Sequence, residues 1–127
     1  MKYLFTDIDD TLTTGGRLLA ETYQALWNLS DAGILVVPVT GGSAGWAAHI
    51  VRTWPVAAVI GAGGAFVLML REGRVTFEFW NDEATQRQRQ ASHLATLKPM
   101  LEGTGFEIAH DQSFRIADVA IDIGGHA

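Results

Sequence analysis

The chain has 127 residues, a mass of 13.7 kDa and no cysteine, so it is about the size of one domain and has neither a disulfide framework nor a thiolate metal site. Nine Lys and Arg residues against 14 Asp and Glu residues give a net charge of -5, which argues against binding to nucleic acid or to a membrane surface. Hydrophobic residues make up 48% of the chain, enough for a packed core. The apolar run at the N-terminus is too short for an export signal, so we expect a cytoplasmic protein.

The first half of the chain alternates short apolar runs with helical patterns. We expect strands over residues 3–8, 34–39 and 56–60, with helices over residues 18–32 and from an N-cap at Ser43 onward. Short connections between a strand, a helix and the next strand imply right-handed crossovers. The fold class is therefore α/β, with an open, Rossmann-like parallel sheet and flanking helices, and the functional crevice lies beyond the carboxyl ends of the strands.

The second half of the chain has a different pattern and predicts a smaller α+β unit. Its expected elements are a hairpin over residues 65–70 and 74–80 with a turn at Gly73, a long surface helix over residues 81–102 capped by Asp82, and two strands over residues 106–109 and 117–123. We place the Rossmann-like core in residues 1–80 and the beginning of the α+β unit in residues 81–127.

Three acidic residues follow the first expected strand within a very short span. The carboxylates of Asp7, Asp9 and Asp10 repel one another unless a cation lies among them. Oxygen ligands without cysteine indicate Mg²⁺, which takes one or two carboxylates together with waters and phosphate oxygens. The alternative is that Asp7 and Asp9 only cap a turn.

A second polar group follows the next expected strand. Thr40 and Gly41 offer a hydroxyl and backbone N–H groups beside the start of a helix, which is a favourable site for an anion. The alternative is an ordinary connection from a strand to a helix. Because both groups follow parallel strands, we expect them to face one crevice.

These segments resemble motifs of a known superfamily. Residues 5–13 (FTDIDDTLT) resemble the first motif of the haloacid dehalogenase (HAD) superfamily. Residues 37–46 (VPVTGGSAGW) resemble its second motif as found in the IIB subfamily, which includes sucrose-phosphate and trehalose-phosphate phosphatases. Residues 111–122 (DQSFRIADVAID) are similar to a segment of that subfamily's C2-type cap domain, so the resemblance implies that residues 81–127 begin such a cap and leave it incomplete.

The resemblance implies a Mg²⁺-dependent phosphatase that hydrolyses a small phosphomonoester, with a sugar phosphate as one candidate. Asp7 attacks phosphorus to form an aspartyl-phosphate, and Asp9 protonates the leaving alcohol and then activates water. Asp7 and the backbone carbonyl of Asp9 bind Mg²⁺, and Thr40 with the N–H of Gly41 holds the phosphoryl oxygens. The turn over residues 10–16 acts as a flap beside the nucleophile.

The chain also departs from the family pattern. It has Gly42 where the subfamily usually has Arg, and Ala-Gly-Gly at residues 62–64 where Glu-Asn-Gly is common. A third motif with a Lys and a fourth with metal-binding acids follow the cap in this family, whereas the lysines here are only Lys2 and Lys98. We therefore expect this chain by itself to be nearly inactive. The alternatives are a non-catalytic fragment or pseudo-phosphatase that binds metal or phosphate without turnover, and a phosphoacceptor domain of the response-regulator type.

Arg115 is the residue in the cap-like segment that we single out as a candidate contact to substrate, with an ion pair to Asp111 or Asp118 as the alternative. Asp118 and Asp122 are expected to be solvated acids of one strand. The four histidines do not have the spacing of metal ligands. They are His49, His93, His110 and His126.

The sheet predicted for this chain has an exposed edge. We expect unpaired backbone groups and apolar faces of residues 34–39 or 56–60 at that edge, and hence self-association through edge pairing or exchange of elements.

Overall fold

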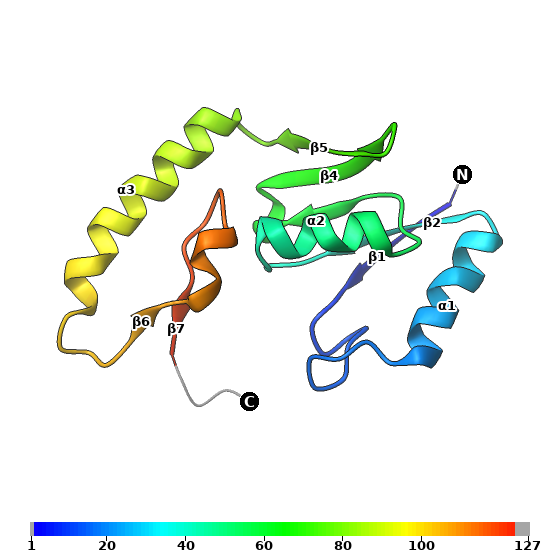
Figure 1. The fold of residues 1–127 in the computed structure, drawn as a ribbon, viewed down its shortest axis with the longest axis horizontal. Coiled ribbons are helices and arrows are strands. Elements are labelled where there is room, and N and C mark those ends of the chain that lie inside the picture. The colour runs from blue at the N-terminus through cyan, green and yellow to red at the C-terminus, as the bar shows by residue number, and fades with distance from the viewer. Residues whose placement is uncertain (1, 124–127) are drawn as a thin grey trace.

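The computed structural model describes residues 2–123, and its main feature is one mixed five-stranded sheet (Figure 1). The strands, in spatial order, are β1 (Lys2–Asp7), β2 (Ile34–Val39), β3 (Val59–Gly61), β4 (Phe66–Arg71) and β5 (Arg74–Phe79). β1, β2 and β3 are parallel, whereas β4 and β5 form an antiparallel hairpin that continues the same sheet. The expected α/β class with a Rossmann-like sheet is confirmed, and the hairpin makes the sheet mixed.

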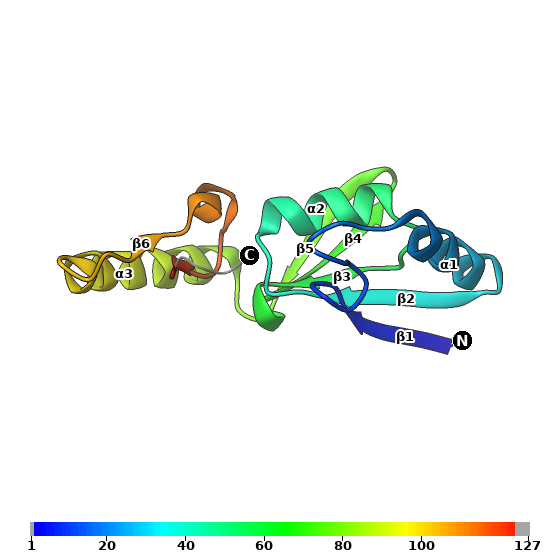
Figure 2. The ribbon, with the colours of Figure 1, turned by 90° about the horizontal axis from the view of Figure 1, so that it is seen from below.

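The two crossover helices pack on one side of this sheet. α1 (Ala20–Asp31) connects β1 to β2, and α2 (Ala44–Thr53) connects β2 to β3. Because the strand order is sequential, both right-handed crossovers place their helix on the same face, as Figure 2 shows. The core lies under α2, where buried side chains of the helix meet buried side chains of the strands. Its members are Ile8, Ala44, Ala47, Ile50, Val51, Val59, Phe66 and Leu68.

The other face of the sheet has no helix on it among residues 2–123 (Figure 2). The register of the strands shows which side chains it carries, since directly paired residues point to the same side and successive residues alternate. Val59 pairs with Leu68 on the helix side, so their neighbours lie on the open side. The open side carries Tyr3, Phe5, Leu35, Val37, Val39, Ile60, Val67 and Met69.

One prediction about the sheet edge is wrong. β2 and β3 lie inside the sheet with partners on both sides, so neither residues 34–39 nor 56–60 form an edge. Within residues 2–123, β1 lies at one side of the sheet and pairs with β2 alone. The sequential strand order decides this, because it leaves the first strand outermost. Tyr3, Leu4 and Phe5 on this strand are 57%, 41% and 61% exposed.

The remaining elements form a separate layer beside the sheet (Figure 1). They are α3 (Glu83–Leu101), β6 (Glu107–Ile108), a 3-10 turn η2 (His110–Phe114) and β7 (Ile121–Asp122), with β6 and β7 paired in their own two-stranded sheet. The predicted N-caps are confirmed, since Ser43 accepts a hydrogen bond from the N–H of Trp46 and Asp82 accepts one from Thr85. The division into a core and a cap-like unit stays a prediction.

None of the helices within residues 2–123 is long and apolar enough to cross a membrane. Residues 54–70 carry no charged side chain. This stretch is not one helix but contains β3, a 3-10 turn η1 (Ala62–Gly64) and most of β4.

Candidate active site

The first group of candidate residues lies at the carboxyl end of β1. Asp7 is the last residue of the strand and is exposed. Its Oδ2 accepts a hydrogen bond of 3.1 Å from the Thr11 hydroxyl. Among the described residues this is the only hydrogen bond to that carboxylate, so the second oxygen, Oδ1, faces solvent without a partner.

The loop after Asp7 is organised around the carbonyl of Ile8. Ile8 is fully buried in the core, and its carbonyl accepts hydrogen bonds from the N–H groups of Thr11, Leu12 and Thr13 at 3.1, 2.9 and 3.1 Å. This anchoring leaves Asp9 exposed beside Asp7. Asp10 takes a positive φ of 59°, and its N–H donates to the Thr13 hydroxyl at 3.1 Å. The tight loop therefore holds the acidic residues at the strand end.

A small hairpin follows this loop. Thr14 and Arg17 form an antiparallel bridge with N–H to carbonyl distances of 2.8 and 3.1 Å. The two residues between them, Gly15 and Gly16, both have positive φ, which a two-residue turn of this type requires. The segment that the resemblance assigns to a flap is thus a tight hairpin next to Asp7.

The second group of candidate residues lies at the end of β2. Thr40 is buried, with its N–H donating to the carbonyl of Ile60 and its hydroxyl accepting from the N–H of Gly42 at 2.9 Å. Ser43 then caps α2. Gly41 is exposed, and a Cβ atom at this position would meet no atom within 4 Å. The backbone at Gly41 is therefore accessible beside the N-terminus of α2, as an anion site requires.

Gly42 has a steric reason to be glycine. A Cβ atom at this position would lie 2.8 Å from Cδ1 of Trp46 and 3.1 Å from the Thr40 hydroxyl. The Arg that the resembled subfamily usually carries there would therefore require the Trp46 side chain to shift.

The strand register brings the two groups together. Asp7 pairs directly with Val39, the residue before Thr40, and neighbouring strands lie about 4.8 Å apart. The acidic loop and the Thr40–Gly42 turn therefore lie side by side at the carboxyl ends of β1 and β2. Their chemical roles stay predictions.

All three nitrogens of the Arg115 guanidinium donate hydrogen bonds to other residues of this chain. Its Nε and Nη2 donate to the two oxygens of Asp111 at 3.1 and 3.0 Å, and its Nη1 donates to Asp118 at 2.6 Å and to the carbonyl of Gly41 at 3.0 Å. The side chain is only 10% exposed. Burial lowers the pKa of Arg115, but the hydrogen bonds and charges of Asp111 and Asp118 outweigh it, and the net pKa is raised. The geometry favours the ion pair over a contact to substrate.

The expectation of a solvated Asp118 in a strand is wrong. Asp118 lies in an irregular segment, since β7 begins only at Ile121, and its Oδ2 is paired with Arg115. Its Oδ1 is buried and has no hydrogen-bond partner in the described part of the chain. Asp122 does lie in β7 and is partly exposed.

Two glutamines hold the irregular segment, and neither was predicted from the sequence. The amide of Gln90 on α3 donates to the carbonyls of Arg115 and Asp118 at 2.9 and 3.0 Å. Gln112 donates to the Asp118 carbonyl and accepts from the N–H of Ala120, both at 2.9 Å. These side chains use the backbone groups that a longer β7 would need. A lone glutamine in a polar helix carries no pattern that reveals such a contact.

The residues at the strand ends fit Mg²⁺ in the chemistry of their donor atoms. The Asp7 carboxylate and the backbone carbonyl of Asp9 are oxygen ligands, and Mg²⁺ needs only one or two carboxylates besides waters and substrate oxygens. Among residues 2–123, no group of three or more His, Asp and Glu side chains converges on one point. His126 lies outside the described residues.

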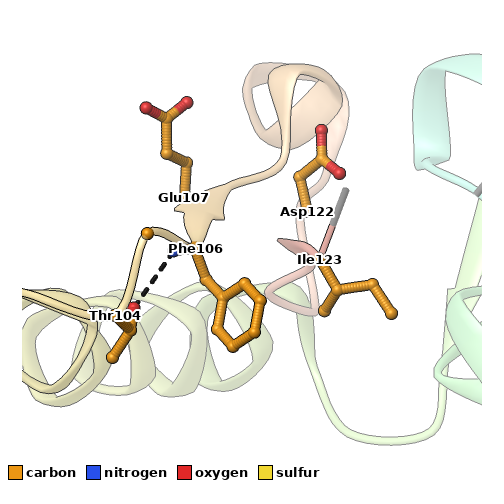
Figure 3. A pocket seen from close by; sticks show the side chains of 6 residues that line it. Thr104, Phe106, Glu107, Asp122 and Ile123 are labelled. Atoms are coloured by element: carbon orange, nitrogen blue, oxygen red, sulfur yellow. Dashed lines mark hydrogen bonds between the residues drawn. The ribbon is translucent and has the colours of Figure 1, made fainter. Parts of the chain in front are cut away.

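Two hollows lie in the cap-like layer, away from the strand ends. One, of about 280 Å³, is lined by Thr104, Gly105, Phe106, Glu107, Asp122 and Ile123. Figure 3 shows Glu107 and Asp122 extending to one side of β6 and β7, with Phe106 and Ile123 on the other. The second, of about 450 Å³, lies between α3 and residues 117–119. Neither hollow brings together residues that the sequence analysis singled out for catalysis.

Comparisons with known proteins give matches among solved structures alone, since no family model and no curated protein sequence matches the chain. A phosphatase of the haloalkanoate (HAD) superfamily from Bacteroides thetaiotaomicron is 28% identical, with a TM-score of 0.52 over 76% of this chain and 35% of its own length. A haloacid dehalogenase-like hydrolase from B. subtilis is 25% identical, with a TM-score of 0.57 over 86% of this chain and 36% of its own.

A hypothetical protein from Geobacillus kaustophilus HTA426 is 21% identical, with a TM-score of 0.55 over 98% of this chain and 44% of its own, and shows the fold alone. The chain thus spans less than half the length of each of these three structures. Over the part that it spans, it has the Rossmann-like fold of HAD-superfamily hydrolases.

Proposed function

We propose that the adjacent ends of β1 and β2 form the phosphoryl-transfer site of a Mg²⁺-dependent phosphatase that acts on small phosphomonoesters. The observation that carries this proposal is the register of Asp7 with Val39, which sets an exposed carboxylate beside the Thr40–Gly41 turn. The hydrolase fold of the similar structures supports the reaction class. Sugar phosphates are the first candidate substrates, because the second motif resembles that of the IIB subfamily.

In the proposed reaction, Asp7 is the nucleophile. Thr11 holds Oδ2 through its hydroxyl, which orients the carboxylate and leaves Oδ1 to attack phosphorus. The oxygen–phosphorus bond of the ester breaks, and the leaving alcohol takes a proton from Asp9. Water then gives its proton to Asp9 and attacks phosphorus, which releases phosphate and restores Asp7.

The Thr40–Gly41 turn binds the phosphoryl group in this proposal. The N–H of Gly41 lies beside the N-terminus of α2, whose dipole favours an anion. The Thr40 hydroxyl already accepts the N–H of Gly42, so its proton is available for a phosphoryl oxygen. The Asp7 carboxylate and the Asp9 carbonyl would hold Mg²⁺, which offsets the repulsion between a phosphate dianion and a carboxylate nucleophile.

The experiment follows phosphate binding and phosphorylation as well as turnover, because the chain spans less than half the length of the similar hydrolases. Phosphate release is measured over a panel of sugar phosphates with and without Mg²⁺, and calorimetry measures binding of Mg²⁺ and of inorganic phosphate. Acid-quenched protein is digested, and mass spectrometry looks for one added phosphoryl group on the peptide with Asp7.

The informative variant is Asp7→Asn, which keeps the shape of the side chain but is a poor nucleophile. Its matched control is Asp31→Asn, which makes the same change at the exposed end of α1, at the opposite end of the sheet. We expect Asp7→Asn to abolish phosphorylation and any turnover, and Asp31→Asn to leave both unchanged. Mg²⁺-dependent phosphate binding without phosphorylation would favour the non-catalytic alternative, and phosphorylation that survives Asp7→Asn would remove Asp7 from its role.

A further inference from the structure

We propose that Arg115 is a positioning residue for the Thr40–Gly42 turn. Its guanidinium fixes the orientation of the peptide unit between Gly41 and Gly42, and through that peptide unit the cap-like segment sets the affinity of the turn for phosphate. The orientation of the peptide unit stands on contacts within this chain, whereas its effect on phosphate rests on the proposed function.

One hydrogen bond connects Arg115 to the turn. Nη1 of Arg115 donates to the Gly41 carbonyl at 3.0 Å across 74 residues of sequence, and it is the only donor to that carbonyl among residues 2–123. The N–H of the same peptide unit belongs to Gly42 and donates to the Thr40 hydroxyl at 2.9 Å. Because the peptide unit is trans, its carbonyl and N–H point in opposite directions. Arg115 and Thr40 therefore hold it from two sides.

The peptide unit needs these partners because side chains do not restrict it. Both residues that it joins are glycines, which accept a wide range of backbone angles. A Cβ atom at Gly41 would meet nothing within 4 Å, so no neighbour blocks movement on that side. The preceding peptide unit is held separately, since the Thr40 carbonyl accepts the N–H of Gly63 at 3.2 Å. The orientation of the Gly41–Gly42 peptide unit therefore depends on its own two hydrogen bonds.

This orientation decides what the turn offers to an anion. In the observed orientation, the Thr40 hydroxyl oxygen accepts the Gly42 N–H, so the hydroxyl proton can be donated to a phosphoryl oxygen. If the peptide unit reversed, the Gly41 carbonyl would take the place of that N–H and would accept the hydroxyl proton itself. A carbonyl oxygen in this place would also repel an anion. The observed orientation is thus the one that suits phosphate.

Arg115 acts on the turn through this peptide unit and not by binding phosphate directly. Its Nε and Nη2 donate to Asp111, and its Nη1 donates to both Asp118 and the Gly41 carbonyl. Two carboxylates around one guanidinium outweigh its positive charge, so the cluster as a whole repels a phosphate dianion. The hydrogen bond to the carbonyl is therefore the route by which Arg115 affects the turn.

The cap-like layer holds Arg115 in reach of the turn. Gln90 on α3 donates to the Arg115 carbonyl at 2.9 Å, which fixes the backbone from which the side chain extends. Figures 1 and 2 show η2, in orange, beside the first turn of α2. The two approach closely, since a Cβ atom at Gly45 would lie 3.1 Å from Cβ of Phe114. A shift of the cap-like layer would therefore release the Gly41 carbonyl.

Hydrogen exchange of the Gly42 amide, measured by NMR, tests the positioning without reference to function. Arg115→Lys keeps the positive charge but lacks the fork that reaches both carboxylates and the turn at once. We expect the Gly42 amide to exchange about tenfold faster in this variant, because it loses a hydrogen bond to a charged group that holds the peptide unit. The Ala47 amide, which donates to the Ser43 carbonyl in α2, is the internal reference for general unfolding.

Asp111→Asn is the matched control for stability. It removes one charge from the same cluster but leaves the hydrogen bonds from Nη1 of Arg115 in place. Both variants should lose stability in urea unfolding, whereas only Arg115→Lys should speed exchange at Gly42 relative to the internal reference. Equal acceleration in both variants would overturn the positioning role, because the turn would then follow the general stability of the segment.

Calorimetry with inorganic phosphate and Mg²⁺ tests the effect on binding. We expect Arg115→Lys to weaken phosphate binding about tenfold and Asp111→Asn to have little effect. Weaker binding with unchanged exchange at Gly42 would overturn the proposal, because it would indicate a direct contact between Arg115 and phosphate. Unchanged binding with faster exchange would also overturn it, because the orientation of the peptide unit would then not matter to the anion.

The same measurements separate this inference from the proposed function. If the natural chain binds no phosphate but exchange at Gly42 responds as expected, the proposed function fails, whereas the control of Arg115 over the turn stands. If the natural chain binds phosphate and Arg115→Lys changes neither binding nor exchange, the positioning role fails and the proposed function stands.

Discussion

The clamp that Arg115 forms between the cap-like segment and the Gly41 turn gives the sharpest test of the fold. Arg115→Ala removes one charged side chain that donates to Asp111, Asp118 and the carbonyl of Gly41. The variant leaves two carboxylates without their cation and frees the segment after η2 from the turn. We therefore expect a loss in the free energy of unfolding and not only a local change.

The size of the expected loss in the free energy of unfolding depends on how exposed Arg115 and its two partners are. Breaking a fully buried ion pair costs about 3–5 kcal/mol, whereas an exposed pair contributes about 0–1 kcal/mol. The side chain of Arg115 is 10% exposed, and those of Asp111 and Asp118 are 43% and 31% exposed. Water can therefore solvate the Asp111 carboxylate in part, whereas Oδ1 of Asp118 is buried. We expect a loss of about 2–3 kcal/mol, between these limits.

The control is Arg87→Ala. Arg87 pairs with Glu83 at 2.8 Å in a similar spacing, but both side chains are more than half exposed. We expect this variant to lose about 0.3–0.5 kcal/mol. Urea unfolding followed by circular dichroism measures both values. A loss for Arg115→Ala that equals the loss for Arg87→Ala would refute the clamp, because it would show that neither burial nor the bidentate geometry strengthens the pair.

Two further predictions concern the turn at Gly42 and the start of α3. Gly42→Ala introduces a Cβ atom 2.8 Å from the ring of Trp46, so the indole must move and the tryptophan fluorescence should change, whereas Gly41→Ala, with open space around it, should leave the spectrum unaltered. Backbone and hydroxyl hydrogen bonds from Thr85 lower the pKa of Asp82 from 3.8, so its contribution to stability is present above that pH and is lost as the pH falls through the folded-state pKa. Asp82→Asn does not titrate, so its stability should fall less than that of the natural chain between pH 7 and about pH 3, and an equal fall in urea unfolding would contradict this assignment.

Local patterns determined the elements of this protein. The unbroken apolar run of residues 34–39 became β2 without a change of bounds, and the caps at Ser43 and Asp82 begin their helices as expected. These features depend on side chains within a few residues of each other, so the sequence alone specifies them. The placement of Asp7 and Thr40 at strand ends follows from the same local signals together with the right-handed crossover rule.

Contacts between distant residues decided the rest. The alternation over residues 117–123 predicts a strand, but Gln90 and Gln112 take its backbone groups, and only Ile121–Asp122 pair. The order of the strands within residues 2–123 was also beyond a local pattern, because β1 is as apolar in its middle as β2, which has a partner on each side. Arg115 has a guanidinium that suits a phosphate as well as a carboxylate, and the fold decides between them by placing Asp111, Asp118 and the Gly41 carbonyl within hydrogen-bond distance. The guanidinium determines which chemical groups Arg115 can bind, and the tertiary structure determines which of those groups lie within hydrogen-bond distance of it.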